Sequence, residues 1–174
     1  MATTATLVQE HIPELKVICL DHPTTSATSS SASSLPSMIR EIPINYILEK
    51  LHRLGPQYLN DKSTAYAELH IDGCPKSYYV HREYLTLQSN FFNVIFNNGD
   101  ISNGDVITIS LPASELFDPI LEYFYDGDAE KFYDSLNEHN YERVWRNVEY
   151  LGMGDEARAV CLAYFQNEIG GQHE

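Results

Sequence analysis

The sequence predicts an α+β fold in which a small three-stranded sheet is flanked by a cluster of helices. Apolar and polar residues alternate over residues 65–71, and Asp72-Gly73 follows as a hairpin turn signal. Several other segments repeat apolar residues every three or four positions, which is the helical period. The order of elements, with a helix, a hairpin, a helix, a strand and then helices, is typical of a sheet packed against helices.

Local signals in the sequence set the bounds of the predicted elements. Pro43 suits a first helical turn, and Gly55-Pro56 is expected to end that helix. Ser114 is expected to cap the helix after the third strand, in which Pro119 fits only if the helix begins late. Asn140 is expected to cap the next helix. The predicted elements are a helix over residues 43–54, strands over 65–71 and 78–80, one helix over 85–96, a strand over 106–111, and helices over 117–125, 140–151 and 155–165.

The chain divides near residue 37. Residues 24–34 read TTSATSSSASS, and all aromatic residues come after them. Such a stretch cannot bury enough apolar surface to offset its ordering entropy. We therefore expect a disordered Ser/Thr-rich tail over residues 1–37 and one folded domain over residues 38–174. Residues 15–20 (LKVICL) form a semi-apolar patch in the tail, and a linear motif, an added edge strand and no role at all remain open for it.

The composition limits the classes of partner. The chain has 11 Lys+Arg against 25 Asp+Glu, a net charge of −14, which disfavours nucleic acid and anionic membranes as partners. Between residues 99 and 142 the only base is Lys131, so this region is either a solvated face or a surface that attracts basic partners. Cys19, Cys74 and Cys161 form no C-x-x-C pair, and no glycosylation acceptor or long apolar leader is present. We expect an intracellular protein of the cytoplasm or nucleus.

No motif for catalysis or metal binding is complete. Phosphate-binding glycine loops, the hydrolase serine elbow and the H-E-x-x-H pair are all missing. Residues 126–130 resemble a calcium loop, but Lys131 stands where glycine must turn the chain. His70, Cys74 and His81 flank the hairpin and offer too few ligands for a structural zinc site. We expect no catalytic residue, cofactor or metal.

Residues 80–96 resemble the BTB/POZ family, which has there a histidine opening a helix, then a leucine, a serine and phenylalanines at fixed steps. Residues 117–127 are similar to the family's F-x-x-L-L-x-Y-x-Y-x-G helix, and residues 136–153 look like its closing helical pair. The resemblance covers about residues 43–169. The residues that match the family spacing in the first of these segments are His81, Leu85, Ser89, Phe92 and Phe96.

The resemblance implies a non-catalytic protein–protein interaction module that self-associates, recruits a partner, or does both. In dimeric relatives the first helix lies across the two-fold interface. The candidate dimer residues are Ile44, Ile47, Leu48 and Leu51. Other relatives recruit a cullin N-terminal domain through the loop after the phenylalanine helix and through the Y-x-Y helix. The candidate docking residues there are Phe96, Ile101, Tyr123 and Tyr125, with an acidic rim of Asp100, Asp105, Asp118, Glu122, Asp126 and Asp128.

The chain departs from the family pattern in two places. Family dimers often place an aspartate at the start of the first strand and a basic residue before the serine, where this chain has Tyr66 and Gln88. The cullin-docking signature includes a glutamate that is missing from residues 101–103. A cullin ubiquitin-ligase adaptor and a monomeric elongin C- or Skp-type subunit that binds a receptor helix therefore both stay open. A small thiol enzyme using Cys74 and His81 is a third alternative.

Overall fold

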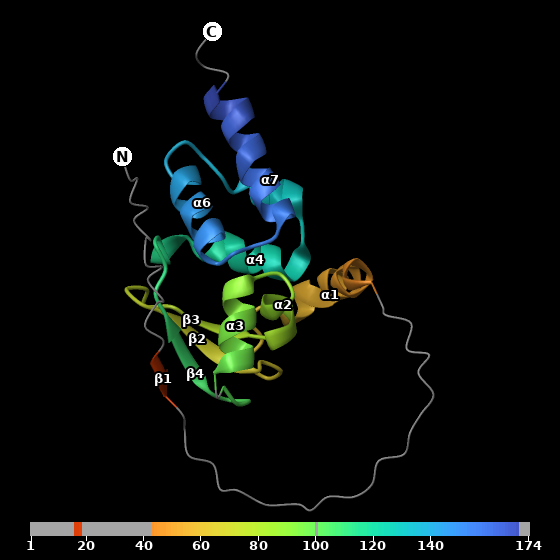
Figure 1. Cartoon of the computed structure of the whole chain (residues 1–174), viewed down its shortest axis with the longest axis vertical. Helices are drawn as coiled ribbons and strands as arrows, with labels where there is room; N and C mark the ends of the chain where they lie inside the picture. The colour runs from red at the N-terminus through yellow and green to blue at the C-terminus, as the bar shows by residue number, and fades with distance from the viewer. Residues whose placement is uncertain (1–15, 19–42, 100, 171–174) are drawn as a thin grey trace, which may run out of the picture.

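A computed structural model describes residues 16–18, 43–99 and 101–170, and it confirms the predicted α+β class (Figure 1). The sheet has the strand order β1-β4-β2-β3. β2 and β3 form the expected antiparallel hairpin, β4 lies parallel to β2, and the short β1 is added antiparallel to β4. The strands are β1 (Lys16–Ile18), β2 (Ala67–Ile71), β3 (Ser77–Val80) and β4 (Val106–Ile109).

The helices surround the sheet unevenly. Figure 1 shows α2 and α3 beside the strands, α1 projecting to one side, and α6 and α7 at the end away from the sheet, with α4 between the two parts. No helix within the described ranges is long and apolar enough to cross a membrane. The helices are α1 (Ile44–Tyr58), α2 (Arg82–Thr86), α3 (Asn90–Asn98), α4 (Asp118–Asp126), α5 (Ala129–Asp134), α6 (Tyr141–Tyr150) and α7 (Asp155–Tyr164), with short turns η1 (Ser114–Leu116) and η2 (Phe165–Ile169).

One core joins the sheet to the helices. Leu69 on β2, Phe124 on α4 and Val148 on α6 have no exposed surface. Burying each such side chain stabilises the fold by about 1.5–3 kcal/mol. Asn147 is also fully buried, and its side-chain amide accepts from the Ala113 N–H (3.0 Å) and donates to the Ala113 C=O (2.8 Å). This pair of hydrogen bonds fixes the segment after β4 to α6.

The predicted end of the first helix is wrong, because α1 continues through Gly55 and Pro56 to Tyr58. The Leu59 N–H still donates to the Gly55 C=O at 2.9 Å, so the helical pattern persists beyond the proline. The glycine serves a different purpose. A Cβ added to Gly55 would lie 1.8 Å from the backbone oxygen of Tyr125 on α4. Gly55 therefore permits the close crossing of two helices and does not stop the first one.

The single helix predicted over residues 85–96 is also wrong, since the chain forms α2 and α3 with a break between them. Ser89 occupies the break in an extended conformation. Its hydroxyl accepts from the Phe92 N–H (3.2 Å) and donates to the Leu151 C=O (2.5 Å). The serine thus caps α3 and ties it to the end of α6.

Two further differences concern residues 114–134. Ser114 begins the turn η1 and does not cap α4, which begins late at Asp118 with Pro119 in its first turn. α5 was not anticipated. Asp128 caps α5 by accepting from the Lys131 N–H at 3.0 Å, so part of the supposed acidic loop is the start of a helix.

The semi-apolar patch over residues 15–20 contributes β1. Of the three alternatives for the patch, the structure supports the added edge strand, since Lys16–Ile18 pairs with Val106–Thr108 of β4. The other residues of the predicted tail lie outside the described ranges, and the predicted boundary at residue 37 stays a prediction.

Gly55→Ala should destabilise the protein by about 3 kcal/mol or more, because the added methyl group meets rigid backbone and the helices must separate. The matched control is Gly154→Ala, where an added Cβ meets nothing within 4 Å. Gly154 is the N-cap of α7, where alanine is less favourable than glycine, so that control should cost only about 0.5–1 kcal/mol. Urea unfolding of both variants measures the difference, and equal midpoints would contradict the close crossing.

Candidate functional site

α1 carries the largest group of exposed apolar side chains in the described ranges. Seven large apolar residues are exposed across these ranges, and four of them belong to α1: Ile44 (51%), Tyr46 (52%), Ile47 (36%) and Leu54 (44%). Contiguous exposed apolar surface marks interaction sites in soluble proteins. Of the predicted dimer residues, Ile44 and Ile47 are exposed, Leu48 is half-buried, and Leu51 packs against the core.

The second half of α1 is fastened to the domain while the first half projects from it (Figure 1). Besides Gly55, the side chains of Leu51 and Tyr58 pack against the core. The Tyr84 hydroxyl of α2 donates to the Leu51 C=O at 2.9 Å. The exposed Ile44 and Ile47 therefore lie on a part of the helix whose direction is set by contacts further along it.

A buried histidine completes this attachment. His81 follows β3 and is only 9% exposed. Its backbone N–H donates to the Tyr125 hydroxyl oxygen (2.9 Å), and its Nδ1 lies 2.8 Å from the same oxygen. Its Nε2 lies 2.9 Å from the hydroxyl of Thr64, which donates to Asp61 at 3.0 Å. The Tyr58 ring of α1 packs edge-on against the imidazole, with ring centroids 5.6 Å apart.

These contacts select the neutral histidine with its proton on Nε2. Burial raises the pKa of the Tyr125 hydroxyl far above its usual range, so this group stays protonated and donates to Nδ1. Hydrogen bonds from Ser63 lower the pKa of Asp61, which therefore stays ionised and accepts from Thr64. The Thr64 oxygen is then left to accept from Nε2–H. Burial lowers the pKa of His81, which also favours the neutral form. The negative charges of Glu83 and Asp61 act in the opposite direction but do not outweigh burial.

A second polar junction lies where α1, α2 and α4 meet. Gln88 donates from its side-chain amide to the C=O of Tyr84 (2.9 Å) and of Phe124 (2.6 Å). Its side-chain oxygen lies 3.0 Å from Nε2 of His52 on α1. A Cβ at Gly127 would meet that histidine ring at 2.1 Å, so the glycine leaves room for it. Gln88 thus places an uncharged amide at the position where the family resemblance suggests a basic residue.

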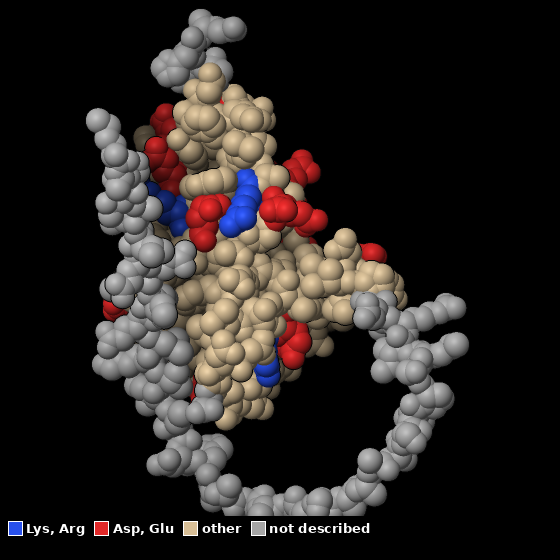
Figure 2. Space-filling model, in the orientation of Figure 1, with Lys and Arg blue, Asp and Glu red and all other residues tan. Residues whose placement is uncertain are grey.

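A groove of about 500 Å³ borders the projecting half of α1. Leu48 lines it from α1, Gln88 from the segment between α2 and α3, and Glu156 from α7. Figure 2 shows few charged side chains over α1 on the visible face, whereas acids and bases gather over the helices at the other end. The apolar face of α1 and this groove together form the candidate interaction surface.

The four predicted docking residues do not lie on a surface. Phe96, Ile101, Tyr123 and Tyr125 are at most 8% exposed. Tyr125 stacks on Tyr84 with ring centroids 4.3 Å apart, and Tyr123 stacks on Phe132 at 4.9 Å. Their assignment as surface anchors is therefore corrected: all four belong to the core, because each lies on the inward side of its segment.

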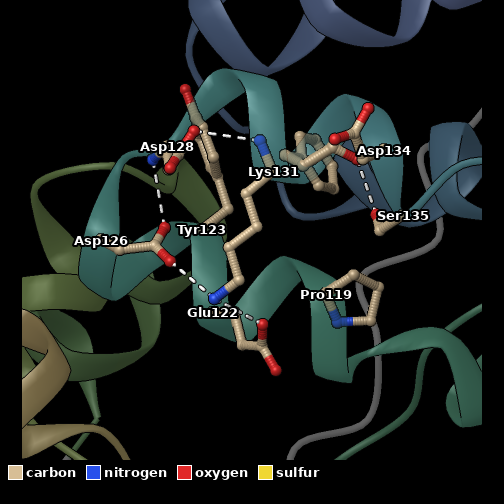
Figure 3. Close-up of a pocket in the computed structure, with 9 residues that line it drawn as sticks. Pro119, Glu122, Tyr123, Asp126, Asp128, Lys131, Asp134 and Ser135 are labelled. Carbon is tan, nitrogen blue, oxygen red and sulfur yellow. Dashed lines mark hydrogen bonds and ion pairs between the residues drawn. The ribbon is translucent and has the colours of Figure 1, made fainter.

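The predicted acidic rim is partly neutralised by its own cations. The Lys131 ammonium group lies 2.8 Å from Glu122 and 2.9 Å from Asp126 beside a cavity of about 240 Å³ (Figure 3). The hydrogen bonds that this ammonium group donates to both carboxylates raise the pKa of Lys131. Asp118 pairs with Lys76. The remaining members differ in placement, since Asp105 is buried, Asp128 is exposed, and Asp100 lies outside the described residues.

The structure does not favour a thiol site at the hairpin. Both ring nitrogens of His81 are engaged by Tyr125 and Thr64, and the Sγ of Cys74 lies 4.0 Å from the Tyr78 hydroxyl. The Nε2 of His70 contacts Glu68 at 2.8 Å. Within the described part of the chain, no group of three or more His, Cys, Asp or Glu side chains is arranged to hold a metal ion.

Comparison with known proteins identifies the family. The BTB/POZ domain model matches residues 57–168, more than half of the chain, so the chain belongs to the BTB/POZ family. BTB domains are generally protein–protein interaction modules, not enzymes, and many of them dimerise. The match begins near the end of α1, and the projecting half of that helix lies before it.

Solved structures of BTB domains resemble the chain in fold. The BTB domain of zebrafish PATZ1 is 17% identical with a TM-score of 0.53, and the match covers 79% of this chain and 100% of that one. The BTB domain of human gigaxonin is 19% identical with a TM-score of 0.52, covering 79% and 99%. At these identities the likeness establishes the fold alone. No curated protein sequence matches the chain.

Stability should fall as the pH drops from 7 to 5.5, and His81 should account for much of the fall. Its pKa is lower in the folded protein than the ordinary value near 6.5, so the unfolded chain binds the proton first. The stability that neutral His81 contributes is therefore complete above pH 6.5 and is lost as the pH falls below it. In this range the free energy of unfolding should fall by up to about 1.4 kcal/mol per pH unit.

Denaturant unfolding of His81→Gln across this pH range should give a smaller slope, together with lower stability at pH 7. The control is His139→Gln, whose side chain is 86% exposed and which should keep the wild-type slope. If His81→Gln and the wild type have the same slope, the assignment of His81 as the responsible group is wrong.

Proposed function

We propose that the chain is a self-associating interaction module whose dimer contact is the exposed apolar face of α1. The observation that carries the proposal is the exposure of Ile44 and Ile47 at helical spacing on the projecting half of the helix. A second copy that covers these side chains removes them from water, and this burial of apolar surface stabilises the dimer. The groove lined by Leu48 and Gln88 adds recessed surface that a second copy can fill.

The fixed direction of α1 supports the same proposal. The contact at Gly55 and the hydrogen bond from Tyr84 to Leu51 hold the helix before any partner binds. A surface that is already ordered loses less conformational entropy on association. Self-association therefore needs no prior rearrangement of this helix.

Cullin recruitment is not part of the proposal. All four docking residues expected for it are buried, and the docking glutamate is missing from residues 101–103. An elongin C- or Skp-type monomer would instead use an exposed apolar face for a receptor helix. The mass of the free protein in solution separates that alternative from self-association.

Light scattering coupled to size-exclusion chromatography at micromolar concentration should give the mass of a dimer, and Ile47→Asp should shift it to a monomer. Burying a charge at the contact should weaken association by about 2 kcal/mol or more, roughly thirtyfold. Thermal stability should change little, because Ile47 is exposed in the single chain.

The matched control is Leu162→Asp on α7, where an apolar residue is 48% exposed and does not line the groove beside α1. This variant should remain a dimer. A wild-type monomer would favour the receptor-binding alternative, and a dimer that withstands Ile47→Asp would place the contact elsewhere.

A further inference from the structure

The outer edge of β4 offers backbone hydrogen-bonding groups to another strand. The C=O of Ile109 accepts from the Asp72 N–H at 2.8 Å, so Ile109 faces β2. Successive residues of a strand direct their N–H and C=O groups to opposite edges. Ile107 therefore also faces β2, whereas Val106 and Thr108 direct theirs to the outer edge.

The opposite edge of the sheet is blocked by side chains of the folded domain. Val80 of β3 faces β2, because its C=O accepts from the Tyr66 N–H at 2.8 Å, so Tyr79 faces outward. The Tyr79 N–H donates to the side chain of Asn60 at 2.7 Å, and the Lys62 ammonium group lies over the tyrosine ring. Proteins commonly block exposed sheet edges in such ways to prevent strand addition.

The β4 edge is covered differently, by a strand of the same chain. The register pairs Lys16 with Thr108 and Ile18 with Val106, so the two outward-facing residues of β4 have partners in β1. β1 pairs through its three described residues. In the sequence, residues 19–43 separate this strand from α1. Three paired residues joined to the domain by 25 others gain from a high effective concentration at the edge, and a strand from another protein can compete with them.

We propose that the outer edge of β4 binds an extended segment of a partner protein, and that residues 16–18 occupy this edge as an internal competitor. The proposal adds a second interaction surface to the domain and does not depend on self-association through α1. It also assigns a role to the semi-apolar patch over residues 15–20.

The edge sets the chemistry of the partner segment. In strand addition the main chain supplies affinity and alternate side chains supply specificity. A residue paired with Ile107 lies on the face where Ile107 is fully buried, so the partner needs an apolar, preferably β-branched, residue there. The flanking residues pair with Val106 and Thr108, which are half-buried, and can be polar. Val17 holds the central position in the pairing within the chain.

The test uses the full chain and a fluorescein-labelled peptide of residues 12–21 carrying Cys19→Ser. Ile18 pairs with Val106, whose backbone groups face the outer edge, so Ile18→Pro in the full chain removes a β1 donor that points at β4 and should free the edge. Fluorescence anisotropy should then give a Kd at least about tenfold lower for the Ile18→Pro chain than for the wild type. Ser30→Pro, which places a proline outside the strand, should bind as the wild type does.

A peptide with proline at the position of Ile18 should not bind, because it lacks the donor that faces Val106. Ile47→Asp should bind the unaltered peptide as the wild type does, which separates this proposal from self-association through α1. Equal Kd values for the wild type and the Ile18→Pro chain, or binding to neither, would overturn the proposal.

Amide hydrogen exchange locates the effect. In the Ile18→Pro chain the amides of Val106 and Thr108 should lose protection and regain it when the peptide is added. The Ile107 amide faces β2 and should stay unchanged. Unaltered protection of Val106 and Thr108 would show that β1 does not occupy this edge, and it would also overturn the proposal.

Discussion

The close crossing of α1 over α4 is the contact on which the other features of the candidate surface depend. It requires Gly55, since any side chain there would meet the backbone of Tyr125. Tyr125 then serves three neighbours: its backbone contacts α1, its ring stacks on Tyr84 of α2, and its hydroxyl bonds to His81 after β3. One residue of α4 thereby connects α1, α2 and the hairpin. The direction in which α1 leaves the domain follows from this connection.

The elements that the sequence predicts well are those whose signal is local. The alternation over residues 65–71 and the turn at Asp72-Gly73 place the hairpin, because a two-residue period can be read without knowing the neighbours. The role of Gly55 could not be read in this way. Gly-Pro usually ends a helix, and the reason it does not here lies 70 residues away at Tyr125. Ser89 is a similar case. Its hydroxyl donates to the carbonyl of Leu151, which is distant in sequence, so this part of its role could not be read from the local pattern.

The candidate site was predictable only in part, for a related reason. Helical spacing identifies which residues share a face, but not whether that face meets the core or solvent. On α1 the stripe passes from exposed at Ile44 to packed at Leu51 along one helix. On α4 the same kind of spacing gives the fully buried Tyr125. The family resemblance draws attention to residues on both α1 and α4. Only the three-dimensional structure shows which of these side chains are exposed and can therefore contact a partner.

The distribution of charge makes α1 the most favourable place for two copies to meet. The chain has a net charge of −14, so like faces of two copies generally repel. α1 itself holds one acid, Glu49, against Lys50 and Arg53. The acids of α4 lie elsewhere, and two of them are already paired with Lys131. Screening at physiological salt acts over about 8 Å, so charges far from the contact contribute little. A contact centred on α1 therefore gains from apolar burial with little electrostatic cost, which no acid-rich face of the domain would permit.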